Sequence, residues 1–300
     1  SGSLPRVAYV LDKPFEKCRP CGKQALTMMM GFGCNAAGVV GCRIIDSPRE
    51  RLLAMLTNNL VPCNGRFPTL LALSAIFFAG RGGMVPALLV TGFVVLGVGL
   101  TFLLTWMLSR TVLKGVPSSY VLELPAYRRP QVGQVVVRSL LDRTLFVLGR
   151  AVAVAAPAGL ILWLLAHWTV GGVSMLNHAA AFLDPVGRFL GMDGVILLAF
   201  LLGFPANEIV IPIAVMIYQA QGALSDTGTY AALGRVLIDN GWTWVTALCV
   251  LLFSLCHWPC STTLLTIRKE SGSWKWALLA ALAPTTLGVV LCALVNVVLG

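Results

Sequence analysis

The stretch LLGFPANEIV, residues 201–210, places a proline, an asparagine and a glutamate inside a long apolar run. Proline removes a backbone donor and breaks a helix, and lipid offers no partner for the carbonyls that are freed. Such a break is tolerated only where it is buried in protein or lines a wet cavity. A charge at the bilayer centre costs about 2.5–3.5 kcal/mol on insertion scales, so Glu208 is predicted to face a cavity or a partner. The alternative is a protonated glutamate that bonds to a neighbouring helix.

The sequence around this stretch is that of a polytopic membrane protein. Of its 300 residues, 57% are hydrophobic and 11% are charged, and the mean hydropathy is +0.84, whereas a soluble domain carries about 25% charged residues. Runs of about 20 apolar residues can cross a bilayer as helices. Uninterrupted runs cover residues 84–108, 145–166 and 276–299, and interrupted runs cover 24–45, 52–79, 194–218 and 242–267. The predicted fold is therefore an all-α, polytopic transmembrane helix bundle with interrupted or re-entrant helices.

The net charge of +10 is interpreted as a topology signal, because Lys and Arg collect on the cytoplasmic side of a membrane protein. Basic clusters at residues 43–51 and 110–143 are placed in the cytoplasm, and the segment 168–193, which contains Asp184 and Asp193, is placed outside. If residues 194–218 and 242–267 each crossed once, the basic residues at 268–275 would lie outside. At least one of these segments is therefore predicted to be a re-entrant pair of half-helices. Nucleic-acid binding is not expected, because the charges are spread over short loops.

The two halves of the chain share a degenerate repeat. The first half has GFGCN at residues 31–35 and then PCN at 62–64, and the second has GFPAN at 203–207 and then PCS at 259–261. Repeated pairs of Gly- or Pro-interrupted spans indicate a substrate site near the middle of the bilayer in transporters. The sequence therefore predicts one broken helix pair in each half.

Candidate metal ligands gather at these breaks. Thiolates suit soft or borderline metals, whereas carboxylate and amide oxygens suit harder ones, so a mixed set fits a borderline divalent ion such as Fe²⁺. Cys256 lies one helical turn before Cys260, so these two cysteines share a helix face if their helix persists as far as Pro259. The predicted ligands are Cys34, Asn35, Cys63, Asn207, Glu208, Cys256 and Cys260. Free cysteine is also a common apolar filler, which is the interpretation for Cys42, Cys249 and Cys292.

Two further hypotheses remain open. Cys18 and Cys21 have CxxC spacing, which suggests a redox pair or half of a zinc site, although no second CxxC or CxxH completes a zinc set. A membrane thiol redox protein would use this pair together with Cys256 and Cys260. A carrier of an organic solute such as a nucleoside is the other alternative, since interrupted repeats serve many substrates.

The order of motifs resembles the membrane core of the FeoB ferrous-iron transporters. The motifs are SGSLPRVAYVLDK, GFGCN, RERLLAML, PCNGRFPTL, ELPAYRRP and PCSTTLLTIRKE, and they span nearly the whole chain. The resemblance implies Fe²⁺ as the transported ion and a bacterial cytoplasmic (inner) membrane location. It also implies that Cys34, Cys63, Cys260 and Glu208 lie on the ion path. In one departure, Ala36 and Ala37 stand where the family has a hydrophobic residue and proline, so Gly33 and Gly38 are expected to supply flexibility.

The resemblance also divides the chain and suggests partners. The residues themselves indicate an interfacial lead (1–23) and a cytoplasmic amphipathic linker (111–143). The resemblance implies the end of a first Gate-like region (24–53), a FeoB-specific membrane segment (54–110), and a second Gate-like region with C-terminal helices (144–300). The chain has no GxxxxGK[ST] pattern, so no nucleotide site and no GTPase activity are assigned to it. The expected partners are membrane lipid, a GTP-binding domain in the full-length protein or in trans, small Feo accessory proteins and a second copy of the chain.

Overall fold

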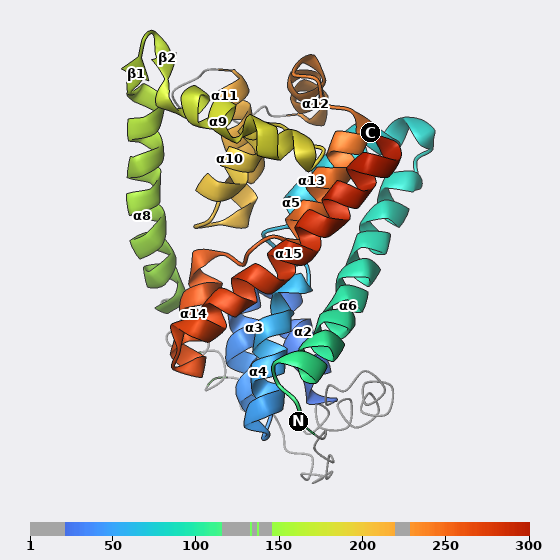
Figure 1. Cartoon of the computed structure of the whole chain (residues 1–300), viewed down its shortest axis with the longest axis vertical. Helices are drawn as coiled ribbons and strands as arrows, with labels where there is room; N and C mark the ends of the chain where they lie inside the picture. Colours follow the sequence, from blue (N-terminus) through green and yellow to red (C-terminus); the bar gives the residue numbers. More distant parts are fainter. Residues whose placement is uncertain (1–21, 116–132, 134–136, 138–145, 220–228) are drawn as a thin grey trace. The chain divides into compact units, whose positions relative to one another are not determined.

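A computed structural model describes residues 22–115, 133, 137, 146–219 and 229–300 (Figure 1). The expected lead, most of the linker and the Cys18/Cys21 pair lie outside the described residues. The chain divides into two compact units. Unit 1 comprises Ser1–Cys63, Val98–Val154 and Thr262–Ala280, and unit 2 comprises Asn64–Gly97, Ala155–Ser261 and Ala281–Gly300.

The described secondary structure is helical apart from one short hairpin of strands β1 and β2, which confirms the predicted all-α class. The elements of the first half are α2 (Lys23–Gly33), α3 (Asn35–Gly41), η1 (Cys42–Ile44), α4 (Pro48–Thr57), η2 (Asn58–Leu60), α5 (Phe67–Phe78), η3 (Ala79–Arg81) and α6 (Val85–Thr111). Those of the second half are α8 (Phe146–His167), β1 (Thr169–Val170), β2 (Val173–Ser174), α9 (Met175–Phe189), α10 (Gly194–Leu202), η5 (Asn207–Ile209), α11 (Val210–Tyr218), α12 (Tyr230–Asp239), α13 (Trp244–Cys256), α14 (Ser261–Ser271) and α15 (Trp274–Leu299).

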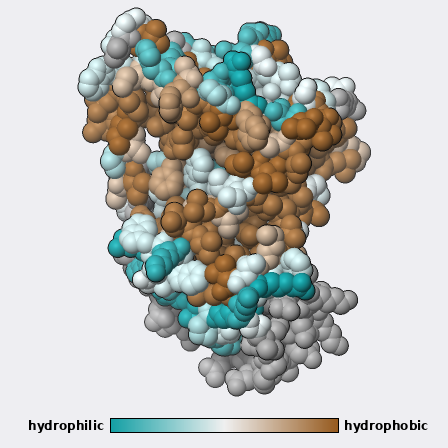
Figure 2. Space-filling view, viewed as in Figure 1, coloured by the Kyte–Doolittle hydropathy of each residue, from teal (hydrophilic) through white to brown (hydrophobic). Residues whose placement is uncertain are grey.

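Three described stretches are long and apolar enough to cross a membrane: Val85–Thr111, Trp244–Ser271 and Trp274–Leu299. A fourth is possible if α9 and α10, which meet at a bend of 108°, count as one broken span. Large apolar side chains such as Leu88, Leu160 and Val297 are 64, 59 and 81% exposed, and apolar residues are frequent on the face shown in Figure 2. Helices that expose such side chains are suited to lipid rather than water.

In unit 1, α2 and α3 form a helical hairpin that turns at Cys34. A Cβ built on Gly38 of α3 would lie 2.9 Å from the carbonyl oxygen of Thr27 on α2 and 2.5 Å from Asn58 Nδ2. Only glycine therefore allows this close approach, so Gly38 has a packing role rather than the expected hinge role. Lys23 at the start of α2 forms an ion pair with Asp46, which lies shortly after α3. The two ends of the hairpin therefore lie next to each other, as the two ends of a re-entrant segment would.

Polar side chains tie the helices of unit 1 together. Gln24 of α2 donates to Thr57 of α4 at 3.2 Å, and Thr105 of α6 donates to the same Thr57 hydroxyl at 3.2 Å. Hydrogen bonds of this kind take the place of the hydrophobic driving force that helices lack in lipid. Arg43 pairs with Glu270 of α14 through two hydrogen bonds of 2.7 and 2.6 Å. The basic cluster that begins at Arg43 therefore lies in the same unit as the cluster at 268–275.

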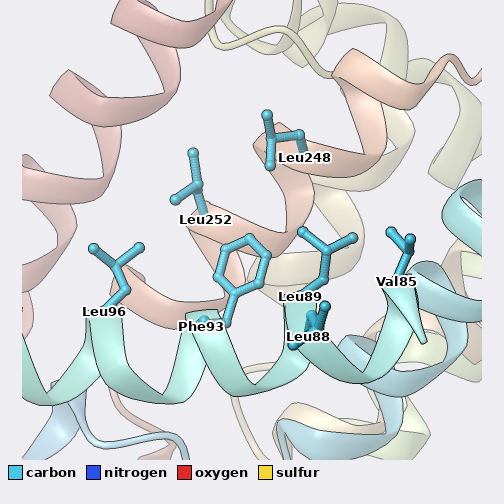
Figure 3. Close-up of a pocket in the computed structure, with 8 residues that line it drawn as sticks. Val85, Leu88, Leu89, Phe93, Leu96, Leu248 and Leu252 are labelled. Carbon is cyan, nitrogen blue, oxygen red and sulfur yellow. The ribbon is translucent and has the colours of Figure 1, made fainter.

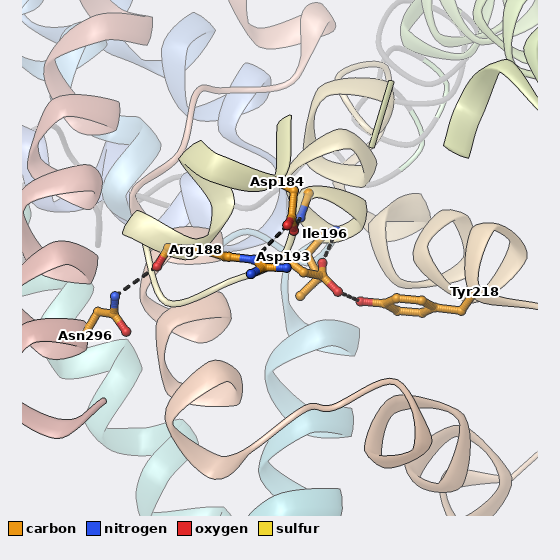
Figure 4. A network of polar contacts seen from close by, with 7 residues as sticks. Asp184, Arg188, Asp193, Ile196, Tyr218 and Asn296 are labelled. Atoms are coloured by element: carbon orange, nitrogen blue, oxygen red, sulfur yellow. Dashed lines mark hydrogen bonds and ion pairs between the residues drawn. The ribbon is translucent and has the colours of Figure 1, made fainter. Parts of the chain in front are cut away.

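In unit 2, α10 runs away from α9 and α11 returns alongside it (Figure 1). Asp193 caps the N-terminus of α10 through a 2.7 Å bond from the Ile196 amide. The Tyr218 hydroxyl, at the last residue of α11, donates to the other Asp193 oxygen and accepts a 2.9 Å bond from Trp242 Nε1. The first and last residues of this segment therefore meet (Figure 4). Residues 194–218 therefore form a hairpin of two short helices, which is the form that the charge pattern predicts for at least one of the segments 194–218 and 242–267.

Candidate functional site

The tip of the α10–α11 hairpin lies against the break between α13 and α14. The Ser261 amide donates to the carbonyl oxygen of Phe204 at 2.9 Å. His257 Nε2 lies 3.3 Å from Asn207 Oδ1. Pro205 and Pro259 stand in the two breaks, and proline cannot donate a helical hydrogen bond. Two interruptions therefore meet inside unit 2, and each provides a partner for the backbone or side chains of the other.

The same backbone turn occurs at the tip of the hairpin in unit 1. Cys34 has φ −155° and ψ 124°, and Ala206, at the same place in the GFxxN motif, has φ −152° and ψ 122°. Each is followed by an asparagine that begins the return helix, and Asn35 and Asn207 are only 3 and 7% exposed. The two halves thus share a local structure at the first motif of the repeat.

The buried asparagine of unit 1 anchors its hairpin tip to the segment that precedes Cys63. Asn58 Nδ2 donates to the carbonyl oxygen of Asn35 at 3.2 Å. With its amide rotated to donate, Asn35 reaches the carbonyl oxygens of Gly31, Asn58 and Val61 at 3.2, 3.2 and 3.3 Å. Because three acceptors are satisfied in this orientation, we assign it. Asn35 therefore holds the turn, and neighbouring Cys34 is exposed.

Glu208 projects from the tip of the hairpin in unit 2 and is exposed. Its Oε2 atom would be 2.8 Å from a Cβ built on Gly65, in the PCNGRFP loop. A glycine therefore gives the carboxylate room beside the backbone of that loop. The contact joins the second half of the chain to Gly65, the residue after the PCN motif of the first half, and both residues belong to unit 2.

His257 is 1% exposed and fixes the end of α13. Its Nδ1 lies 3.1 and 2.9 Å from the carbonyl oxygens of Phe253 and Ser254, so Nδ1 carries a proton and donates. The ring also contacts Phe200 of α10, with ring centroids 5.0 Å apart. His257 was not among the predicted ligands, yet its Nε2 faces Asn207.

Among the described residues, Arg66 is the largest fully buried side chain and is 1% exposed. Its Nη1 donates to the carbonyl oxygen of Leu255 at 2.8 Å, and its Nη2 donates to that of His257 at 3.3 Å. These two bonds place the guanidinium at the C-terminal end of α13. Arg66 was not among the predicted site residues, although it lies within the interrupted apolar run at 52–79. The rule that ionisable residues within membrane segments carry function would have found it.

The predicted ligands fall into two groups. Cys34, Asn35 and Cys63 belong to unit 1, whereas Asn207, Glu208, Cys256 and Cys260 belong to unit 2. Helix α13 ends at Cys256, and residues 257–260 are not helical. The condition for Cys256 and Cys260 to share a helix face is therefore not met, because the helix stops before Pro259. Cys256 is fully buried, whereas Cys260 is half-buried.

Among the described residues, no group of three or more His, Cys, Asp or Glu side chains could hold a metal ion. A single metal site made from the seven predicted ligands stays a prediction. Cys42, Cys249 and Cys292 are each 0% exposed, as expected of packing residues. The Cys292 thiol donates to the carbonyl oxygen of Cys249 at 3.3 Å, which joins α15 to α13.

An apolar pocket of about 440 Å³ opens between α6 and α13 in unit 2 (Figure 3). It is lined by Val85, Leu88, Leu89, Gly92, Phe93, Leu96, Leu248 and Leu252. These side chains offer no ligand for an ion. The pocket is therefore separate in chemistry from the polar junction of the hairpin tip and the α13 break.

These features define a multi-pass helical membrane protein that contains hairpins of short helices and broken helices. Comparison with known proteins makes the class specific. Residues 1–77 and 148–274 match the Gate family, described as "Nucleoside recognition". Residues 90–142 match the family described as "Ferrous iron transport protein B C terminus". No solved structure matches the chain.

Curated relatives cover nearly the whole chain. The Fe(2+) transporter FeoB of Staphylococcus aureus (strain MSSA476) is 30% identical over 97% of this chain and 43% of its own length. The FeoB of Methanocaldococcus jannaschii is 27% identical over 99% of this chain and 44% of its own length. A fusion of Fe(2+) transport protein A with FeoB from Porphyromonas gingivalis is 26% identical over 92% of this chain and 38% of its own length.

The chain belongs to the Gate family and is the membrane portion of a FeoB family member. It spans about two-fifths of the length of the curated relatives that it matches.

Proposed function

We propose that this chain forms the membrane-spanning part of a ferrous-iron importer in the bacterial cytoplasmic membrane. The observation that carries the proposal is the junction in unit 2, where the tip of a re-entrant hairpin presents Asn207 and Glu208 at the break of a second helix. Polar breaks of this kind form ion sites in membrane transporters. The relatives' printed names supply the substrate, Fe²⁺.

The ion is proposed to lose water to oxygen and sulfur ligands at the two hairpin tips. In unit 1 the exposed Cys34 is the ligand that a borderline ion prefers, and in unit 2 the exposed Glu208 supplies a charge that compensates the ion. Cys63 and Cys260, in the PC motifs that follow each tip, complete the proposed path. The cation in turn lowers the cost of a carboxylate within the membrane.

Coupling to nucleotide hydrolysis is proposed to come from a GTP-binding domain, in the same polypeptide or in trans. The chain itself has no phosphate-binding loop. The P. gingivalis relative joins Fe(2+) transport protein A to FeoB in one polypeptide. This fusion supports the proposal that a small accessory protein of that type associates with the present chain.

Uptake of Fe²⁺ into proteoliposomes that contain the full-length protein tests the proposal. Cys34→Ser, Cys63→Ser and Glu208→Gln are expected to lower the rate of uptake, because each removes a proposed ligand without a large change in volume. Asp239→Asn, which changes an exposed acidic residue of α12, is the matched control and should transport normally. Normal uptake by all three ligand variants would refute the proposed path.

A nucleoside carrier is the second candidate, because the matched Gate family is described as "Nucleoside recognition". The same proteoliposomes distinguish the two functions. Uptake of a radiolabelled nucleoside without Fe²⁺ uptake would favour the carrier. The thiol redox hypothesis stays a prediction, because Cys18 and Cys21 lie outside the described residues.

A further inference from the structure

A cationic side chain is buried in the part of unit 2 where a path for a cation is proposed. Arg66 lies beside the break of α13, next in sequence to Gly65, against which the Glu208 carboxylate is placed. Like charges repel each other strongly where the dielectric constant is low. A buried guanidinium at this place would oppose the entry of Fe²⁺ unless it takes part in the handling of the ion.

The acceptors of the guanidinium are backbone carbonyls at the end of a half-helix. The last carbonyls of a helix have no amide of the next turn to accept from, and the aligned peptide dipoles give this end roughly half a negative elementary charge. His257 Nδ1 donates to the carbonyls of Phe253 and Ser254. The carbonyls of Leu255 and His257 accept from Arg66. The end of α13 is therefore stabilised by a positive charge.

Carbonyl oxygens at the ends of broken helices coordinate cations in transporters. The guanidinium occupies the position that such a cation would take at α13, since it is bound to two of the terminal carbonyls. A tethered cation has the advantage that it cannot diffuse away, so the carbonyls stay satisfied when no ion is present.

We propose that the C-terminal end of α13 is a cation-binding site and that Arg66 fills it as a tethered cation. Removal of the side chain leaves a site that accepts a free cation of guanidinium chemistry. In the second part of the inference, which rests on the proposed function, Fe²⁺ competes with Arg66 for the same carbonyls. The arginine then keeps the path closed until an ion displaces it.

Chemical rescue tests the site directly. The Arg66→Ala variant of the full-length protein is placed in lipid nanodiscs, and thermal unfolding is followed in millimolar guanidinium chloride and in millimolar sodium chloride. Guanidinium is expected to raise the unfolding temperature of this variant by several degrees and to leave the wild-type protein unchanged. Arg235→Ala, which removes an exposed arginine of α12, is the matched control and should not respond. An equal response in all three proteins would overturn the proposal.

A second pair of variants separates charge from packing. Arg66→Lys keeps a tethered cation, whereas Arg66→Met fills a similar volume without charge. We expect Arg66→Lys to unfold at a higher temperature than Arg66→Met. If Arg66→Lys folds and Arg66→Met does not, that result supports the proposal in the same way. If Arg66→Met is as stable as Arg66→Lys, the end of α13 needs no cation and the inference is wrong.

The link to transport has its own readout. Under anaerobic conditions Fe²⁺ should raise the unfolding temperature of Arg66→Ala more than that of the wild-type protein. If guanidinium stabilises the variant and Fe²⁺ does not, the cation site stands and competition by iron is refuted. If guanidinium has no effect while the wild-type protein still takes up Fe²⁺, the site is refuted and the proposed function stands.

Discussion

At the scale of single residues, the junction in unit 2 depends on groups that satisfy one another at two helix breaks. Asn207 lies beside His257. His257 donates to the carbonyls of Phe253 and Ser254, and Arg66 donates to those of Leu255 and His257. Burial of polar groups without such partners would cost about 1–3 kcal/mol each. The breaks in α10–α11 and α13–α14 are therefore stable because they occur at the same place.

Gly65 gives the first prediction at this scale. A Gly65→Val substitution would place its Cβ 2.8 Å from Glu208 Oε2, and overpacking of this kind costs about 1–3 kcal/mol. We expect the carboxylate to be displaced and Fe²⁺ uptake to fall, while the protein stays folded by circular dichroism. Gly80→Val is the control, because a Cβ on Gly80 meets no atom within 4 Å. Uptake that is equal in the two variants would show that the position of Glu208 is unimportant.

Sequence reasoning identified some residues of the junction and not others. Asn207 and Glu208 were found because polar groups inside an apolar run are conspicuous. Arg66 was missed because it follows Asn64 and Gly65 in what reads as a polar loop, and its burial depends on α13, which is distant in the sequence. His257 was missed because its role depends on a carbonyl pattern that only the end of a helix creates.

At the scale of elements, each half contains a hairpin of short helices whose two ends are held together. In unit 1 the tie is the ion pair of Lys23 and Asp46, and in unit 2 it is the hydrogen bond between Tyr218 and Asp193. Figure 4 shows that the second tie is part of a wider network, in which Asp184 pairs with Arg188, and the Arg188 carbonyl accepts from Asn296. The network joins α9, α10, α11 and α15 at the open end of the hairpin.

Tyr218→Phe tests the contribution of this tie. The change removes a hydroxyl that donates to Asp193 and accepts from Trp242. Because hydrogen bonds to charged groups contribute about 1.5–3 kcal/mol, we expect a lower unfolding temperature and faster hydrogen exchange in α10 and α11. Tyr230→Phe changes an exposed tyrosine of α12 and is the control. Equal stability of the two variants would mean that the tie does not hold the hairpin closed.

The sequence predicted the positions of the breaks better than the directions of the helices. The GFxxN and PC motifs mark the breaks at Cys34, before Cys63, at Ala206 and before Ser261, since glycine and proline favour helix interruptions. The signal is not sufficient alone, because Pro157, Pro185 and Pro284 lie inside helices. The return of α11 alongside α10 could not be read from periodicity, because these helices are apolar on nearly every side. Charge on either side of the segment supplied that information instead.

At the scale of the whole molecule, the basic residues support one orientation in the membrane. Arg43 and Glu270 form an ion pair within unit 1, and Lys and Arg at residues 43–51, 110–114 and 268–275 belong to that unit. The positive-inside rule places them in the cytoplasm. This orientation requires an odd number of crossings between α9 and the residues at 268–275. A re-entrant α10–α11 hairpin followed by a span through α13 and α14 meets that requirement.

The central claim is that residues 194–218 enter the membrane and leave it on the same side. Single cysteines at His178 and Tyr230, two exposed positions that flank this segment, can be labelled in intact cells with a membrane-impermeant thiol reagent after the native cysteines are replaced. The structure predicts that both positions are labelled from outside, whereas a cysteine at Lys269 is labelled only after the cells are opened. Labelling of His178→Cys but not of Tyr230→Cys in intact cells would show that the segment crosses the bilayer and would contradict the account.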